Sequence, residues 1–223
     1  HAAGLKRGQR VSVWLPNRIE SVVILLACSR NGYVCNPSLH QNYTVREIAQ
    51  LLERIQTAVL FAQAGYGADA DKADIFAAAR ALPGMKRAYR LLPAGAGAAA
   101  EGEYAAFPEL TRAAGALPEP DLNPDKIVYL AFTSGTTGTP KGVLHSDNTL
   151  LANGRAMVHD WHHDDKTILF SHSPLSHHIG TVAIEQSLVA GFEVVVNDLP
   201  PGMKPLDWIV ATGATYVMGV PTH

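Results

Sequence analysis

Residues 127–145 read IVYLAFTSGTTGTPKGVLH, an apolar run followed by a loop of small polar residues. A near-continuous apolar run of this kind is typical of a strand that is buried on both faces of a parallel sheet. Residues 133–142 then hold five hydroxyl side chains, three glycines and one lysine. Glycines allow successive backbone N–H groups to face one anion, hydroxyls add donors, and the lysine adds a positive charge. The stretch therefore predicts a buried strand that leads into a polyphosphate-binding loop.

This loop differs from the phosphate loop of P-loop NTPases. That loop requires a glycine directly before its lysine and Ser or Thr directly after it. Here Pro140 and Gly142 hold those two places, and residues 143–145 have an extended rather than a helical pattern. We therefore exclude a P-loop NTPase. A flexible linker is also disfavoured, because a linker needs neither the buried strand before the loop nor the Pro-Lys-Gly after it.

Strand and helix patterns alternate on both sides of the loop. Strands are predicted at 11–15, 33–35, 58–62, 87–92, 127–132, 168–170, 192–196 and 215–218. Helices are predicted after Asn17, after Thr44, over 69–81 and over 180–190. Strands separated by helices favour βαβ units. We therefore expect an α/β fold with a mainly parallel sheet flanked by helices.

Capping signals mark the ends of two of these helices. Asn17 with Glu20, and Thr44 with Glu47, both have the spacing of a capping box. Gly32 stands where the first of these helices should end, and glycine is the usual residue there. We therefore expect one helix to begin at Asn17 and end at Gly32, and a second to begin at Thr44.

Composition excludes several classes of function. The chain has 223 residues, of which 47% are hydrophobic and 17% charged, and its formal net charge is −2. We expect no nucleic-acid partner, because no basic run could neutralise a phosphate backbone. We expect no membrane span, because no apolar run approaches the ~20 residues that cross a bilayer. Cys28 and Cys35 have neither a redox nor a zinc spacing, which indicates buried free thiols in a cytoplasmic protein.

Two weaker patterns point to other chemistries. His159, His162 and His163 lie among aspartates, but no His-Glu-x-x-His spacing or nearby cysteine accompanies them. We interpret them as a solvated helix end and expect no metal site. Residues 95–100 formally satisfy a dinucleotide-binding pattern, but two acids follow where a helix N-terminus should face a pyrophosphate. An oxidoreductase is therefore disfavoured.

The segment TSGTTGTPKGV, residues 133–143, resembles the phosphate-binding signature of the adenylate-forming superfamily of AMP-dependent synthetases and ligases. That superfamily contains acyl-CoA synthetases, peptide-synthetase adenylation domains and luciferases. Weaker features occur in the same order over nearly the whole chain, among them PLSHHIG at 174–180 and GVPT at 219–222. The segment at 174–180 is similar to the form seen in acyl-CoA synthetases rather than to the Phe-Asp form of adenylation domains. The chain is thus most similar to an acyl-CoA synthetase.

The resemblance implies a reaction and the residues that serve it. Acyl-CoA synthetases use ATP and Mg²⁺ to convert a carboxylic acid to an acyl-adenylate, and then pass the acyl group to CoA. By resemblance, His177 lies near the acyl pocket and binds substrate. The residues that would hold the β- and γ-phosphates are Thr133, Ser134, Gly135, Thr136, Thr137, Gly138 and Lys141. The acid is itself the nucleophile and is ionised at neutral pH, so no Ser/His/Asp set is expected.

The resemblance also implies a longer protein. We interpret residues 1–223 as an incomplete N-terminal ATP- and acyl-binding domain, with a sub-block at 1–92, a loop-rich excursion at 93–124 and a sub-block at 125–223. The C-terminal lid domain and the motifs that bind magnesium, AMP and ribose are absent from these residues, so no catalytic set is complete. We therefore expect the 223 residues alone to show negligible ligase turnover.

Alternatives to this interpretation stay open. One is a non-catalytic nucleotide-binding remnant, and another is an enzyme that passes the acid to an acceptor other than CoA. The acid is a small molecule, with aromatic, alicyclic and medium-chain acids as candidates. An apolar sheet edge at the end of the chain would favour self-association, so a homo-oligomer is a further expectation.

Overall fold

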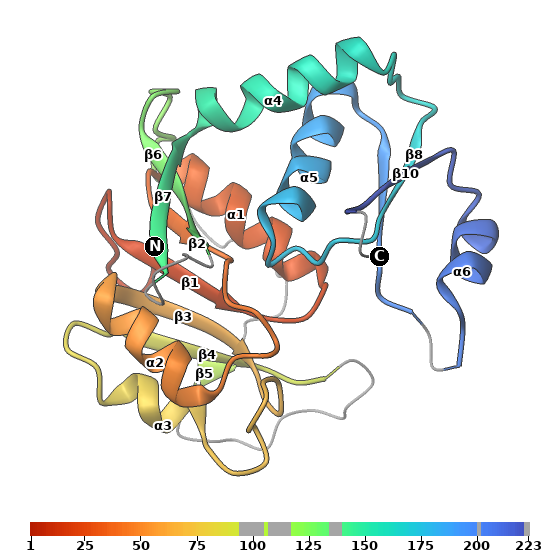
Figure 1. The fold of residues 1–223 in the computed structure, drawn as a ribbon. Coiled ribbons are helices and arrows are strands. Elements are labelled where there is room, and N and C mark those ends of the chain that lie inside the picture. The colour runs from red at the N-terminus through yellow and green to blue at the C-terminus, as the bar shows by residue number, and fades with distance from the viewer. Residues whose placement is uncertain (94–104, 107–116, 134–139, 200–201, 221–223) are drawn as a thin grey trace.

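The computed structural model describes residues 1–93, 105–106, 117–133, 140–199 and 202–220, in which helices and strands alternate (Figure 1). The helices are α1 (Ile19–Asn31), α2 (Val45–Arg54), α3 (Ile75–Arg80), α4 (Asp147–Asp160), α5 (His178–Ala190) and α6 (Pro205–Thr212). The strands are β1 (Arg10–Trp14), β2 (Val34–Asn36), β3 (Thr57–Gln63), β4 (Arg87–Leu91), β5 (Ala105–Ala106), β6 (Ile127–Thr133), β7 (Lys141–Ser146), β8 (Ile168–Ser171), β9 (Glu193–Val196) and β10 (Tyr216–Met218).

The described strands form two sheets. The larger has seven strands in the order β5-β4-β3-β1-β2-β6-β7, and every neighbouring pair is parallel except β6 and β7. The smaller has the order β10-β8-β9 and is parallel throughout. The predicted α/β fold with mainly parallel strands is confirmed. The strands divide between the sheets after β7, whereas the low-complexity excursion in the sequence precedes β6.

Strand β1 explains why both faces of the larger sheet are covered. Successive side chains of a strand point to opposite faces. Val11 and Val13 are buried in the same cluster as residues of α1, whereas Trp14 is buried with residues of α2 and α3. Between them, the fully buried hydroxyl of Ser12 shares a 2.8 Å hydrogen bond with the hydroxyl of Thr57. Helix α1 therefore lies on one face of the sheet, and α2 and α3 lie on the other (Figure 1).

Helix α5 connects the smaller sheet to the larger one. Ala183 of α5 is buried in the apolar cluster of the smaller sheet. The hydroxyl of Thr181 shares a 3.2 Å hydrogen bond with the hydroxyl of Tyr129 on β6. Helix α4 approaches α5 closely at Gly154, where an added Cβ would lie 3.1 Å from the backbone of Glu185. The two helices thus form a tightly packed pair between the sheets.

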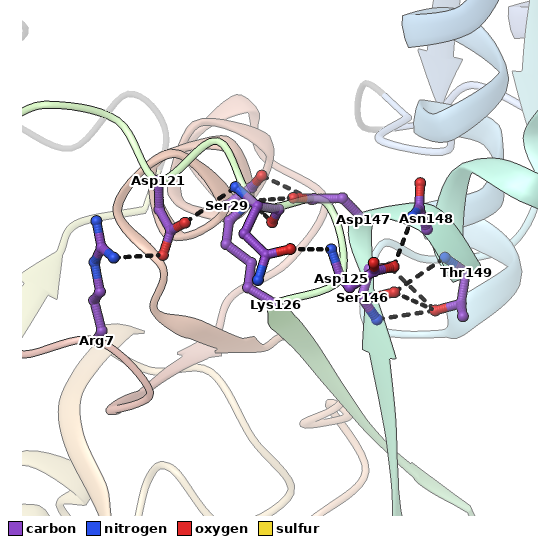
Figure 2. A network of polar contacts seen from close by, with 10 residues as sticks. Arg7, Ser29, Asp121, Asp125, Lys126, Ser146, Asp147, Asn148 and Thr149 are labelled. Carbon is purple, nitrogen blue, oxygen red and sulfur yellow. Dashed lines mark hydrogen bonds and ion pairs between the residues drawn. The ribbon is translucent and has the colours of Figure 1, made fainter.

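A polar network fixes the chain where it re-enters the larger sheet before β6 (Figure 2). Arg7 forms an ion pair with Asp121 at 3.3 Å. The hydroxyl of Ser29 at the end of α1 donates to the carboxylate of Asp147 at 2.8 Å, and Lys126 forms an ion pair with the same carboxylate. These contacts tie the segment before β6 to α1 and to the first turn of α4.

The predicted capping box at the start of α1 is wrong. The N-cap residue is Arg18, without a side-chain cap, and its guanidinium pairs with Glu20 at 2.6 Å. The side chain of Asn17 instead donates to the carbonyl of Asn197 and accepts from the backbone N–H of Leu175. Long-range partners therefore use the groups that a local cap would have used.

Other predicted helix ends are confirmed or corrected. Thr44 and Glu47 form the expected reciprocal capping box at α2, and Gly32 ends α1 with a φ of 68°. The helix predicted over 69–81 is shorter, because Asp74 caps α3 directly before Ile75–Arg80. A capping aspartate sets the start of this helix, which periodicity alone does not reveal.

Buried thiols are confirmed for Cys28 and Cys35, which are both free and buried. The dinucleotide-like pattern at 95–100 lies outside the described residues. In the part of the chain that the structure describes, no helix is long and apolar enough to cross a membrane.

Candidate functional site

The phosphate-loop segment connects the two strands of a hairpin. Strands β6 and β7 pair antiparallel with Thr133 opposite Lys141, and the Thr133 hydroxyl donates to the Lys141 carbonyl at 3.5 Å. Both side chains are exposed. The predicted residues that lie between them, outside the described residues, are Ser134, Gly135, Thr136, Thr137 and Gly138. The extended β7 confirms that no helix follows the loop, in contrast to a P-loop NTPase.

Two side chains from elsewhere in the chain fix the ends of this hairpin. The buried hydroxyl of Ser38, in the loop after β2, donates to the carbonyl of Phe132 at 3.4 Å. The guanidinium of Arg54, the last residue of α2, donates to the carbonyl of Pro140 at 2.5 Å. The loop after β2 therefore holds the end of β6, and α2 holds the residue before β7. Lys141, the first residue of β7, follows a backbone position that is fixed in this way.

His177, the predicted substrate-binding residue, is the N-cap residue of α5 and is exposed. Its imidazole stacks on that of His40, with ring centroids 4.0 Å apart and planes inclined by 16°. His40 lies two positions after Ser38 in the loop that follows β2. That loop therefore contacts both predicted parts of the site, the end of β6 and the ring of His177.

The next residue of α5 contacts the hairpin. The imidazole of His178 stacks on that of His145 near the end of β7 at 4.9 Å, and the ring of Tyr129 on β6 lies 5.5 Å away. Burial, with a smaller contribution from His145, lowers the pKa of His178. The first turn of α5 is thus placed between the loop after β2 and the strand that follows the phosphate loop.

Titratable groups behind the site are held neutral. Burial, with a smaller contribution from His177, lowers the pKa of His40 to about 4. Burial raises the pKa of Glu185 to about 8, and neither of its oxygens has a partner among the described residues. Burial likewise raises the pKa of Tyr129. At neutral pH these groups add no charge beside the exposed Lys141 ammonium.

The histidines after α4 do not form a cluster. His159 is exposed and shares a 3.0 Å contact with Asp160, whereas the ring of His163 packs against Phe192 and Tyr216. Among the described residues, no three His, Cys, Asp or Glu side chains lie together in a way that could hold a metal ion.

A model of the AMP-binding enzyme family matches residues 1–223. The chain belongs to this family. Sulfoacetate–CoA ligase of Cupriavidus necator is 35% identical over 153 residues, which cover 69% of this chain and 27% of that enzyme. Medium-chain-fatty-acid–[acyl-carrier-protein] ligase of Teredinibacter turnerae is 39% identical over 93 residues, which cover 41% of this chain and 14% of that enzyme. The crystal structure of a Brucella canis acyl-CoA synthetase shares the fold, with a TM-score of 0.77 at 21% identity, over 99% of this chain and 39% of that chain.

The matched residues span less than a third of the length of these two curated relatives. Within this member of the AMP-binding family, sequence analysis missed the residues that support the site from a distance. Asn17 is separated by 158 positions from Leu175, and His40 by 136 positions from its hydrogen-bond partner Ser176. Both residues lie in the loops that follow strands β1 and β2, at the edge where ligands bind in open parallel sheets, and this place in the chain is the signal that could have indicated them.

Proposed function

We propose that the native protein uses ATP to convert a small carboxylic acid to an acyl-adenylate and then transfers the acyl group to CoA. The observation that carries this proposal is the hairpin in the signature segment, where Thr133 faces an exposed Lys141 across the two strands. Hydroxyl and ammonium groups at the loop end of a hairpin can donate hydrogen bonds to a polyphosphate. Membership of the AMP-binding family and similarity to a CoA ligase support it.

The residues of this chain position and stabilise the reactants. ATP supplies the α-phosphate that is attacked and the pyrophosphate that leaves. Lys141 offsets negative charge on the leaving phosphates, and Thr133 with residues 134–138 adds hydrogen-bond donors. The imidazole of His177 lines the pocket that binds the carboxylic acid. The acid needs no general base, because its carboxylate is already ionised at neutral pH.

For Mg²⁺, the described residues supply no three-ligand set, and we assign this ion no step. The acceptor is proposed as CoA because the 174–180 segment has the acyl-CoA synthetase form. A carrier-protein thiol is the second candidate acceptor, which the similarity to a carrier-protein ligase favours. Buried free thiols agree with a reducing, cytoplasmic setting for either acceptor.

The test is acid-dependent exchange of labelled pyrophosphate into ATP, measured on the native protein with aromatic, alicyclic and medium-chain acids. We expect exchange with at least one acid, followed by formation of its CoA thioester and AMP when CoA is added. Thioester formation only on a carrier protein would assign the second acceptor. ATP binding without exchange for any acid would contradict the proposed reaction and favour a nucleotide-binding remnant.

A further inference from the structure

The loop after β2 fixes His40 beside the turn that carries His177. The indole N–H of Trp14 donates to the carbonyl of His40 at 3.1 Å, and the Trp14 side chain is fully buried. Leu39, directly before His40, is also fully buried. The backbone that presents the His40 ring therefore belongs to the packed core of the larger sheet rather than to a loose surface loop.

The ring of His40 contacts two consecutive residues of that turn. Its Nδ1 shares a 3.1 Å hydrogen bond with the hydroxyl of Ser176, and its face stacks on the ring of His177. The ring of Tyr43 lies 5.4 Å away on a tilted plane. His40 is half-buried and His177 is exposed. One imidazole thus forms a fixed surface against which the exposed imidazole is held.

The protonation state of His40 suits this contact. Two stacked imidazoles attract one another when neutral and repel when both carry charge. Burial lowers the pKa of His40 to about 4, so its ring is neutral at physiological pH. Among the described residues, the titratable groups in ring contact with His40 are His177 and Tyr43, and neither is a carboxylate that would stabilise the imidazolium.

We propose that His40 is a positioning residue that fixes the orientation of the His177 imidazole at the acid-binding end of the site. The inference rests on the proposed function for the identity of the ligand. The physical reason is side-chain conformational entropy. An exposed histidine ring samples several rotamers, and ordering such a ring during binding weakens affinity. A ring already held by His40 avoids that loss. The described contact between Thr133 and Lys141 in the hairpin does not involve His40.

Three variants separate the features of His40. His40→Ala removes the ring and the hydrogen bond, His40→Phe keeps a flat ring without Nδ1, and Ser176→Ala removes only the hydrogen bond. His159→Ala is the matched control, because His159 is an exposed histidine on α4 that contacts its neighbour Asp160. Thermal melts of each variant test whether the protein stays folded.

The first measurement is the NMR signal of the His177 ring in histidine-labelled native protein. Stacking on a neighbouring ring displaces its proton shifts by ring current. We expect His40→Ala to abolish this displacement, and His40→Phe to retain most of it. An unchanged His177 signal in His40→Ala would overturn the proposal whether or not the protein activates an acid.

The second measurement is steady-state kinetics of pyrophosphate exchange. We expect His40→Ala to raise KM for the acid about tenfold while KM for ATP stays within about twofold, and His40→Phe to recover most of the loss. Equal effects on both KM values, or no recovery in His40→Phe, would overturn the positioning role. If the wild-type protein shows no exchange with any acid, the proposed function fails, and the NMR measurement still decides whether His40 orients His177.

Discussion

Substitution of Lys141 tests the effect of its charge on the reaction with little effect on packing. Its side chain is exposed at the loop end of the β6–β7 hairpin, opposite Thr133. We expect Lys141→Ala in the native protein to slow pyrophosphate exchange by about ten- to a hundredfold, because one charge that stabilises the leaving phosphates is removed. The free energy of unfolding should change by less than about 0.5 kcal/mol.

Lys166→Ala is the matched control, since Lys166 is an exposed lysine in the loop between α4 and β8. It should leave both exchange and stability unchanged. Exchange rates that fall equally in the two variants would show that general surface charge, rather than the position of Lys141, governs the reaction.

Glu185 should make stability depend on pH. Its carboxyl is 3% exposed, and burial raises its pKa from 4.5 to about 8. Below pH 4.5 the group is neutral in the folded and unfolded states, so it has no effect. As pH rises from 4.5 to 8, the unfolded state releases the proton first, and the contribution of Glu185 to stability falls by about 5 kcal/mol. Above pH 8 this loss is complete.

Glu185→Gln tests the same group by removing its titration. We expect the variant to exceed the wild type in free energy of unfolding by about 5 kcal/mol at pH 8.5 and to match it at pH 4, as measured by urea denaturation. Glu193→Gln, at an exposed position on β9, is the control and should show no such difference. Equal stability of Glu185→Gln and the wild type at pH 8.5 would contradict the neutral, buried form of Glu185.

At the scale of elements, the first turn of α5 depends on Gly180. An added Cβ at this position would lie 2.3 Å from the carbonyl oxygen of Pro174, which is backbone and cannot move aside cheaply. We expect Gly180→Ala to lower the free energy of unfolding by about 2 kcal/mol, although alanine is the better helix former by up to about 1 kcal/mol. Urea denaturation measures the difference.

Gly142→Ala is the control for this substitution. Its added Cβ would make only ordinary contacts, 3.7 Å from the side chain of Leu130. Its stability should stay within about 0.5 kcal/mol of the wild type. If Gly180→Ala were equally neutral, the turn at 174–177 would have to be free to shift, and the fixed placement of His177 would be wrong.

The two capping boxes show where sequence analysis of the elements succeeds. Thr44 and Glu47 form the predicted box, because both partners lie within one helical turn and their described hydrogen bonds are to each other. Asn17 and Glu20 have the same spacing, yet Asn17 bonds residues that lie 158 and 180 positions away. Local spacing therefore identifies a helix start only when no distant partner takes the capping group.

Some residues of the candidate site could be predicted from the sequence, and others depend on contacts between distant segments. Thr133 and Lys141 follow from a contiguous motif, and the strand before them and the extended strand after them are confirmed. His40, Ser38 and Arg54 carry no motif, because their partners are set by which strands lie side by side. Strand β2 lies beside β6 in the sheet, which places the loop after β2 next to the hairpin. The spacing of residues in the sequence does not reveal this strand order.

For the whole molecule, Asn17 couples the larger sheet to the parts that carry His177 and β9. Its side-chain oxygen accepts from the buried backbone N–H of Leu175 at 2.8 Å, and its amide donates to the carbonyl of Asn197 at 3.0 Å. Asn17→Ala leaves both groups without this partner. We expect a loss of about 1–3 kcal/mol in the free energy of unfolding, and faster hydrogen exchange at Leu175.

The control is Asn31→Ala, because the side-chain amide of Asn31 donates to the carbonyl of Ala27 within its own helix. Its loss should cost a few tenths of a kcal/mol and leave exchange at Leu175 unchanged. The comparison separates coupling between the sheets from loss of any one amide hydrogen bond. If Asn17→Ala destabilised the protein without faster exchange at Leu175, Asn17 would have no part in placing the turn that carries His177, and the contacts of His40 with that turn would be sufficient to hold it.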